Sequence, residues 1–160
     1  MLALFTIILA ASAPDSTEAA HALAKKVVQS YANPHHRSGE PSLWRIEWAD
    51  ANGDDMPDAF AYALSAGWCD GGSCTLLVLE AIPEGDQEEL GPFLVVAEVR
   101  GVRGPVVVTE SARRSWQDLV VIDANGTRRR LAFDGETYPP RSTLGDPCGP
   151  EAGTVLFGAD

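Results

Sequence analysis

The spacing of hydrophobic positions changes once along the chain, and this change separates one helix from a series of strands. After Ser16, apolar residues recur at steps of three and four, which is the period of a helix with one buried face. Asp15 or Ser16 can cap its start, and Asn33-Pro34 ends it, because a residue before proline is pushed out of the helical region. The apolar face of the predicted helix consists of Ala20, Leu23, Ala24, Val27 and Tyr31.

Short strand-like segments follow the helix, each bounded by Gly, Pro, Asn or Asp. The first places three apolar side chains on one face and two charged side chains on the other, which is typical of a half-buried strand. About seven strands behind one helix predict an α+β fold, with the N-terminal helix packed on a mostly antiparallel sheet. The predicted strands are 43–49, 59–64, 74–82, 92–99, 105–109, 118–122 and 130–133, and 154–157 is a candidate for a last one.

The first twelve residues, MLALFTIILAAS, have the features of a signal peptide. Their apolar stretch of about ten residues is too short to cross a bilayer but fits the core of an export signal. Ala10 and Ser12 form a small-x-small site for cleavage before Ala13. We therefore expect residues 13–160 to form a single exported domain, secreted or periplasmic. The alternative is a buried N-terminal strand or helix.

Composition narrows the choice of partners. The 160 residues include 23 acids and 12 Lys or Arg, which gives a formal net charge of −11. A surface this acidic repels phosphate groups, so nucleic acid and anionic membranes are poor partners. No apolar run approaches the roughly 20 residues of a membrane span, so we expect no span once the signal is removed. Acids also crowd residues 84–89, which indicates either a solvated surface or a face for a basic partner.

The segment with the clearest chemistry is DANGDDMPD, residues 50–58. Its first, third, fifth and ninth positions carry oxygen-bearing side chains. A hard cation requires this spacing, because alternate side chains of a turning backbone point inward and can supply oxygens to Ca²⁺. The alternative is an acidic, solvated hairpin, since Asn-Gly is itself a turn signal.

This loop resembles the calcium loops of FG-GAP and VCBS repeats, whose pattern is D-x-[DN]-x-D-G-x-x-D between two strands. The resemblance covers residues 44–64. Asp55 departs from it, because the family has Gly at this sharp turn, and Ala61 stands where an EF-hand carries its bidentate Glu, which argues against an EF-hand. The resemblance implies a calcium ion held by Asp50, Asn52, Asp54, the carbonyl of Met56 and Asp58.

The same four residues, Asp-Ala-Asn-Gly, recur from Asp123. Both copies lie between predicted strands, which is consistent with a duplicated hairpin. In the second copy Thr127 and Arg128 stand where the acids would be, so we expect no cation site there.

Two of the three cysteines bracket a short loop. Cys69 and Cys74 flank Asp-Gly-Gly-Ser between two strand-like segments, which predicts a disulfide in an exported protein. This run resembles a class of uncharacterised bacterial exported proteins with a C-x-x-G-x-C-T-L pattern, to which no activity is attached. Cys148 is the odd cysteine, and three readings are open: free, paired with another chain, or exchanging with the other two.

No catalytic motif stands out, and we identify no catalytic residues. We therefore expect a non-enzymatic binding or structural domain with a calcium-binding loop, acting on a protein partner or a cell-envelope component. The alternative is a small secreted hydrolase that uses carboxylates near the calcium loop. A pocket lined by two carboxylates of raised pKa would favour the enzyme, and a surface patch without such a pocket would favour the binding domain.

Overall fold

The computed structural model describes residues 16–35, 42–140 and 145–158. The predicted signal peptide, 1–12, lies outside the described residues. Helix α1 spans Ser16–Ala32, and the one-turn helix η1, Asn33–His35, follows at the predicted Asn-Pro stop. Neither this helix nor any other in the described part of the chain has the length and apolarity needed to cross a membrane.

Nine strands of the described residues belong to one sheet, and all of their pairings are antiparallel. Their order is β1-β2-β4-β5-β6-β7-β8, with β3 paired to β4 and β9 paired to β5. The α+β class is confirmed, and the strand count is higher than predicted. The strands are β1 (Trp44–Ala49), β2 (Asp58–Ala63), β3 (Cys69–Asp70), β4 (Ser73–Ala81), β5 (Phe93–Arg113), β6 (Trp116–Asp123), β7 (Arg128–Leu131), β8 (Asp146–Pro147) and β9 (Gly153–Leu156), with short helices η2 (Ala66–Trp68) and α2 (Gln87–Leu90).

The prediction differs from the structure mainly at β5. The segments 92–99 and 105–109 were expected to be separate strands, because Gly and Pro lie between them. The structure instead continues one strand of 21 residues through this region. Gly101 has a φ of +75°, and the pairing register shifts on both sides of it, so the glycines bend the strand instead of ending it. The other additions, β3 and β8, are two residues long, too short to leave a polarity pattern.

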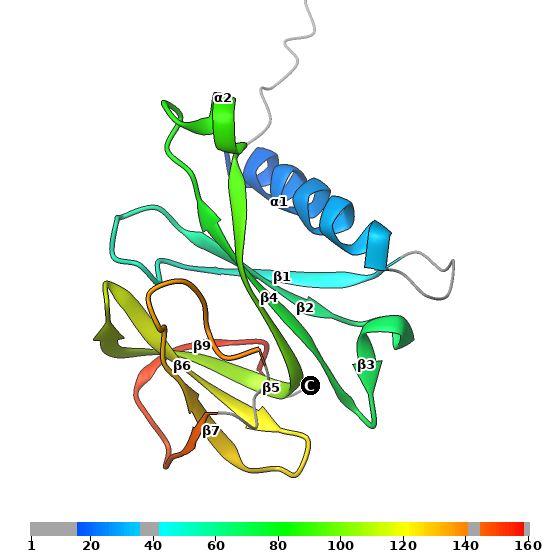
Figure 1. The fold of residues 1–160 in the computed structure, drawn as a ribbon, viewed down its shortest axis with the longest axis vertical. Coiled ribbons are helices and arrows are strands. Elements are labelled where there is room, and N and C mark those ends of the chain that lie inside the picture. Colours follow the sequence, from blue (N-terminus) through cyan, green and yellow to red (C-terminus); the bar gives the residue numbers. More distant parts are fainter. Residues whose placement is uncertain (1–15, 36–41, 141–144, 159–160) are drawn as a thin grey trace, which may run out of the picture.

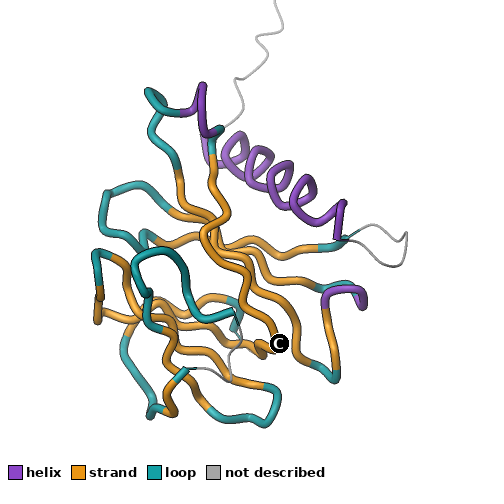
Figure 2. Tube along the Cα trace, viewed as in Figure 1, coloured by secondary structure: helices purple, strands orange, loops and turns teal. Residues whose placement is uncertain are grey.

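Strand β5 connects two parts of the sheet. Its first half pairs with β4, and its second half pairs with β6 and β9 (Figure 1). Helix α1 lies along the part made by β1, β2 and β4, as the tube view also shows (Figure 2). The larger core cluster joins the two parts, because Phe60, Leu76 and Val78 share it with Leu119 and Phe157.

A second core cluster lies between α1 and the sheet. Ala24 and Val28 of the helix pack there with Leu77 and Leu79 of β4. Strands β2 and β4 are therefore buried on both faces, which explains why β4 is almost continuously apolar. Strand β1 keeps the predicted alternation: Trp44, Ile46 and Trp48 pack on the helix side, and Arg45 forms an ion pair with Glu47.

Candidate functional site

The loop between β1 and β2, residues 50–57, is folded around the side chain of Asp50. One carboxylate oxygen, Oδ1, accepts hydrogen bonds from the backbone N–H groups of Gly53 (2.7 Å) and Asp54 (3.3 Å), and Oδ2 accepts one from Asp55 (3.0 Å). Asp55 has a φ of +66°, so the sharp turn that the calcium-loop pattern assigns to glycine is present. Aspartate tolerates this left-handed conformation better than most residues.

The remaining loop oxygens are linked to one another. The amide of Asn52 donates to Asp54 Oδ2 (3.1 Å) and to Glu80 Oε1 (3.4 Å) on β4. The other oxygen of Asp54 accepts the backbone N–H of Met56 at 2.8 Å. The loop is therefore held by its own polar side chains and by contacts to the sheet, which include Glu80 of β4 and the N–H of Gln117 of β6, donated to the carbonyl of Ala51 at 2.7 Å.

Asp58 begins β2 and is fully buried. Its two oxygens accept backbone N–H groups from opposite sides, Ala51 at 3.0 Å and Ala81 at 3.1 Å. Burial raises the pKa of Asp58 to about 6, the two N–H donors oppose this, and the charges of Asp54 and Asp50 add to it. Asp58 thus ties the loop to the end of β4.

The fit of this loop to calcium is mixed. Asp50, Asn52, Asp54 and Met56 lie on one turning segment, as the resemblance implies, while Asp58 lies beneath it and bonds the backbone. Across residues 16–35, 42–140 and 145–158, no three His, Cys, Asp or Glu side chains converge on one point suited to a metal ion. An amide and a carbonyl would have to complete the shell, so calcium binding stays a prediction.

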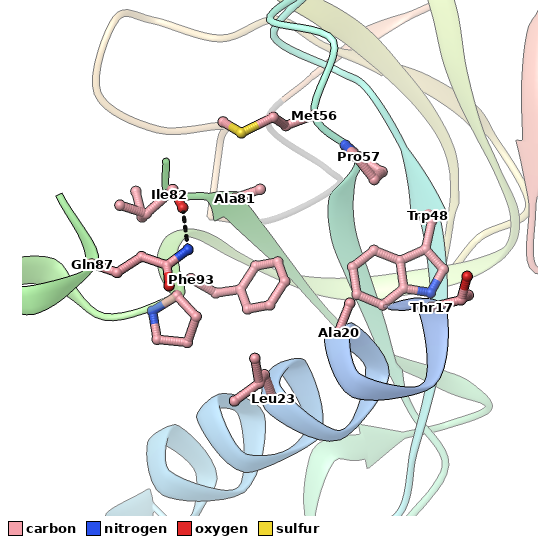
Figure 3. Close-up of a pocket in the computed structure, with 11 residues that line it drawn as sticks. Thr17, Ala20, Leu23, Trp48, Met56, Pro57, Ala81, Ile82, Gln87 and Phe93 are labelled. Atoms are coloured by element: carbon pink, nitrogen blue, oxygen red, sulfur yellow. Dashed lines mark hydrogen bonds between the residues drawn. The ribbon is translucent and has the colours of Figure 1, made fainter. Parts of the chain in front are cut away.

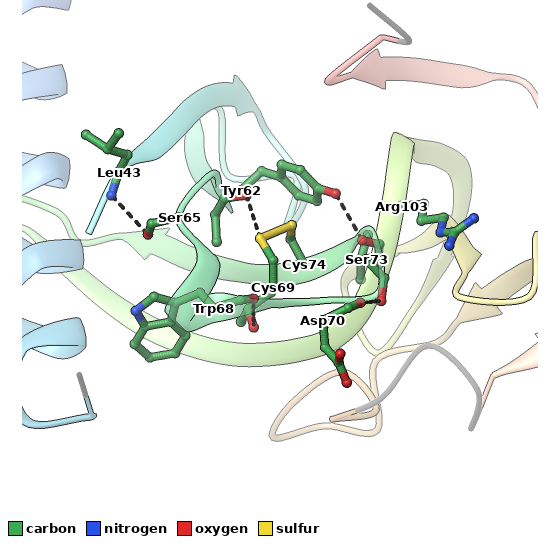
Figure 4. Close-up of a disulfide and its surroundings, with 12 residues drawn as sticks. Leu43, Tyr62, Ser65, Trp68, Cys69, Asp70, Ser73, Cys74 and Arg103 are labelled. Atoms are coloured by element: carbon green, nitrogen blue, oxygen red, sulfur yellow. Dashed lines mark hydrogen bonds between the residues drawn. A yellow bond between two sulfur atoms is a disulfide. The ribbon is translucent and has the colours of Figure 1, made fainter. Parts of the chain in front are cut away.

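The disulfide is present at the predicted place. The Sγ atoms of Cys69 and Cys74 are 2.08 Å apart, and the two residues face each other across β3 and β4 (Figure 4). Gly71 and Gly72 close the hairpin with positive φ values of 56° and 82°. Among the described residues Cys148 is the free cysteine, and burial raises the pKa of its thiol, which disfavours a reactive thiolate.

An apolar pocket of about 500 Å³ lies beside the 50–57 loop (Figure 3). It is bounded by α1, by the end of β1, by the last loop residues, and by the segment that connects β4 to β5. None of the described residues that line it is ionisable. The lining residues are Thr17, Ala20, Leu23, Trp48, Met56, Pro57, Ala81, Ile82, Gln87, Pro92 and Phe93.

The walls of the pocket are supported by specific contacts. The rings of Trp48 and Phe93 lie 5.8 Å apart in a tilted arrangement. The amide of Gln87 donates to the carbonyl of Ile82 at 2.7 Å, and the Ile82 N–H donates to the carbonyl of Pro92 at 3.1 Å. These bonds hold α2 and the β4–β5 connection in place.

The sequence pattern did not reveal this pocket. Ala20 and Leu23 were assigned to the buried face of the helix, but Leu23 is 41% exposed and Ala20 is only partly buried. Both lie in the first turns of α1 and line the pocket. The pocket residues come from four separate segments, so only the tertiary structure brings them together.

Comparison of the chain with protein-family models, curated proteins and solved structures finds no match. The resemblance of residues 50–58 to FG-GAP and VCBS loops therefore stays a prediction, and function has to be argued from the site.

Proposed function

We propose that the protein is a non-enzymatic binding domain that takes an apolar group of its partner into the pocket between α1, α2 and the 50–57 loop. The observation that carries this proposal is the pocket itself. Its volume lies in the range of ligand pockets, roughly 300–1,000 Å³, and its lining is apolar and aromatic as such pockets usually are.

The residues at the pocket also favour binding over chemistry. Trp48 and Phe93 offer rigid aromatic surface, and Met56 is a flexible apolar side chain that adapts to different shapes. The alternative, a hydrolase using carboxylates near the loop, has less support. Asp58 has the raised pKa that such chemistry needs, but it is fully buried and both of its oxygens accept backbone N–H groups.

A neutral fluorescent probe tests the pocket. We expect N-phenyl-1-naphthylamine, which is uncharged and brightens in apolar surroundings, to bind the purified protein. Leu23→Lys places a charge in the pocket wall and should weaken binding about tenfold or more, which corresponds to about 1.4 kcal/mol. The matched control is Leu94→Lys, because Leu94 is 43% exposed, close to the 41% of Leu23, and does not line the pocket. Equal binding by both variants would contradict the proposal.

Export and calcium binding belong to the same proposal. In an exported protein the 50–58 loop would hold calcium through Asp50, Asn52, Asp54, the Met56 carbonyl and Asp58. Two features support this: Asp50 organises the turn through its hydrogen bonds from Gly53 and Asp55, and the charges of Asp54 and Asp50 act on Asp58, where they add to the rise in pKa that burial mainly causes. Because the Met56 side chain also lines the pocket, calcium would stiffen one pocket wall.

Thermal unfolding tests the calcium site. Millimolar Ca²⁺ should raise the melting temperature relative to EGTA, by an amount that corresponds to about 2.7 kcal/mol at a hundredfold excess over Kd. Asp54→Ala should remove this calcium-dependent rise, and Asp70→Ala, at an exposed acid of the disulfide hairpin, should keep it. No rise in the unaltered protein would leave residues 50–58 as an acidic hairpin.

A further inference from the structure

We infer that the partner is a basic protein segment that inserts one apolar side chain into the pocket while its flanking Lys or Arg residues face an acidic rim. This inference rests on the proposed function and adds the chemistry of the partner. It follows from exposed acids that lie within two positions of the pocket-lining residues and do not line the pocket themselves.

The rim acids lie within two positions of lining residues on three different elements. Thr17 of α1, Met56 of the loop and Gln87 of α2 all line the pocket. Each has acidic neighbours that are exposed to solvent. These rim residues are Glu18, Asp54, Asp55, Asp86, Glu88 and Glu89.

Few basic residues oppose these acids. Within two positions of any lining residue, the sequence places only His21 and Lys25, both exposed on α1. On the loop and α2 sides of the pocket, the charged neighbours of the lining residues are therefore acidic, which gives these sides a negative potential. Such a field attracts cations and raises their rate of association.

The distribution of the acids favours a peptide over a small amphiphile. The rim charges belong to the helix, the loop and α2, which bound the pocket from different sides (Figure 3). One ammonium group can approach only one of these sides, whereas a segment with several cations can approach all of them. Each exposed ion pair is weak, roughly 0–1 kcal/mol, so the apolar anchor supplies the specificity and the charges supply orientation.

Calorimetric titration with three acetylated, amidated pentapeptides tests this inference. The probes are Lys-Lys-Phe-Lys-Lys, the anchor-free Lys-Lys-Ala-Lys-Lys and the uncharged Ser-Ser-Phe-Ser-Ser. We expect the first to bind at least about tenfold more tightly than either of the others, and its affinity to fall as salt is raised. Leu23→Lys should weaken it, and Leu94→Lys should not.

A pair of double variants separates the rim from the overall negative charge. Glu88→Gln with Glu89→Gln neutralises two rim acids, whereas Asp70→Asn with Asp146→Asn neutralises two exposed acids on β3 and β8. We expect only the first pair to weaken the Phe-containing basic peptide, by about threefold to tenfold. Equal weakening by both pairs would mean that net charge alone attracts the peptide, and would overturn the inference.

Three further outcomes would overturn it in distinguishable ways. If dodecyltrimethylammonium below its micelle concentration binds the pocket more tightly than the basic peptide, the ligand is a cationic amphiphile and not a protein segment. If the neutral naphthylamine binds in a manner sensitive to Leu23→Lys but the basic peptide gains nothing over Ser-Ser-Phe-Ser-Ser, the proposed function stands and the basic partner does not. Loss of both signals removes the proposed function as well.

Discussion

The two copies of Asp-Ala-Asn-Gly form hairpins in different electrostatic surroundings. The first follows β1 and precedes β2, and the second joins β6 to β7. In both, the glycine has a positive φ, +74° at Gly53 and +82° at Gly126, and the first aspartate accepts backbone N–H groups of its own loop. The tetrapeptide therefore specifies the turn in both places.

The residues after the glycine set the charge. In the second loop, Asp123 is fully buried, accepts N–H groups from Asn125 and Thr127 at 2.9 Å, and forms an ion pair with Arg129 at 2.9 Å. In the first loop, Asp50 is followed by further acids, and Asp58 takes the buried position at the start of the next strand. One loop is neutralised from within, and the other concentrates negative charge beside the pocket.

The largest expected effect is at the neutralised loop. Asp123→Ala removes a buried carboxylate, leaves two N–H groups without their acceptor and leaves Arg129 without its partner, so we expect a loss of about 3 kcal/mol of unfolding free energy. Asp50→Ala, in the more exposed loop, should cost about 1 kcal/mol. Urea unfolding at pH 7 measures both. Equal losses would show that the two loops are energetically alike.

The same variant has a predicted pH dependence. Burial acts to raise the pKa of Asp123, but the N–H donors and Arg129 outweigh it and hold the pKa below its usual value of 3.8. A carboxyl of lowered pKa stabilises the folded state above its usual pKa and loses that contribution as the pH falls through the folded pKa. The difference in unfolding free energy between the unaltered protein and Asp123→Ala should therefore have its largest value at pH 5 to 7 and decrease below about pH 4.

Asp58 should show the opposite sign. Its folded pKa, about 6, lies above its usual 3.8, so the folded state binds the proton more tightly than the unfolded state does. Its contribution to stability is therefore greatest below pH 4 and falls as the pH rises to about 6. We expect the difference in unfolding free energy between the unaltered protein and Asp58→Asn to decrease by about 2 kcal/mol from pH 4 to pH 7.

Asparagine is the suitable replacement because it keeps one carbonyl acceptor and the shape of the side chain. Its NH₂ group faces one of the two backbone donors, Ala51 or Ala81, so the variant should be less stable at pH 4. Unfolding in urea across this pH range gives the difference directly. A difference that stays constant, or that grows toward pH 7, would contradict a raised pKa for Asp58.

The sequence predicted the features that depend on local pattern. The end of the helix follows from the Asn-Pro stop, the faces of β1 follow from the alternation of Trp44, Ile46 and Trp48, and the disulfide follows from its spacing. These depend on neighbours a few residues away. The family pattern placed a sharp turn at position 55 but counted Asp55 as a departure from it, and the structure forms the left-handed turn there with aspartate.

The features it missed depend on residues far apart in the chain. Whether Gly101 ends or bends β5 depends on β4 and β6, which continue to pair on both sides of it. Asp58 can be the buried acid of the loop because the N–H group of Ala81, on strand β4, donates to it. The pocket depends on how the first turns of α1 lie relative to the sheet. Leu23 has the same spacing in the sequence whether its side chain lines a pocket or packs in a core.

The smallest expected effect is at Asp55, where the first loop departs from both the second loop and the calcium pattern. Asp55→Gly relieves a left-handed conformation, and the added chain entropy of glycine in the unfolded state offsets most of the gain. We expect an increase of about 0.5 kcal/mol in unfolding free energy without calcium. Asp55→Asn is the matched control, because asparagine tolerates the same conformation and removes the same charge. If Asn stabilises the protein as much as Gly does, repulsion among the acids, and not the backbone conformation of Asp55, is the source of the gain.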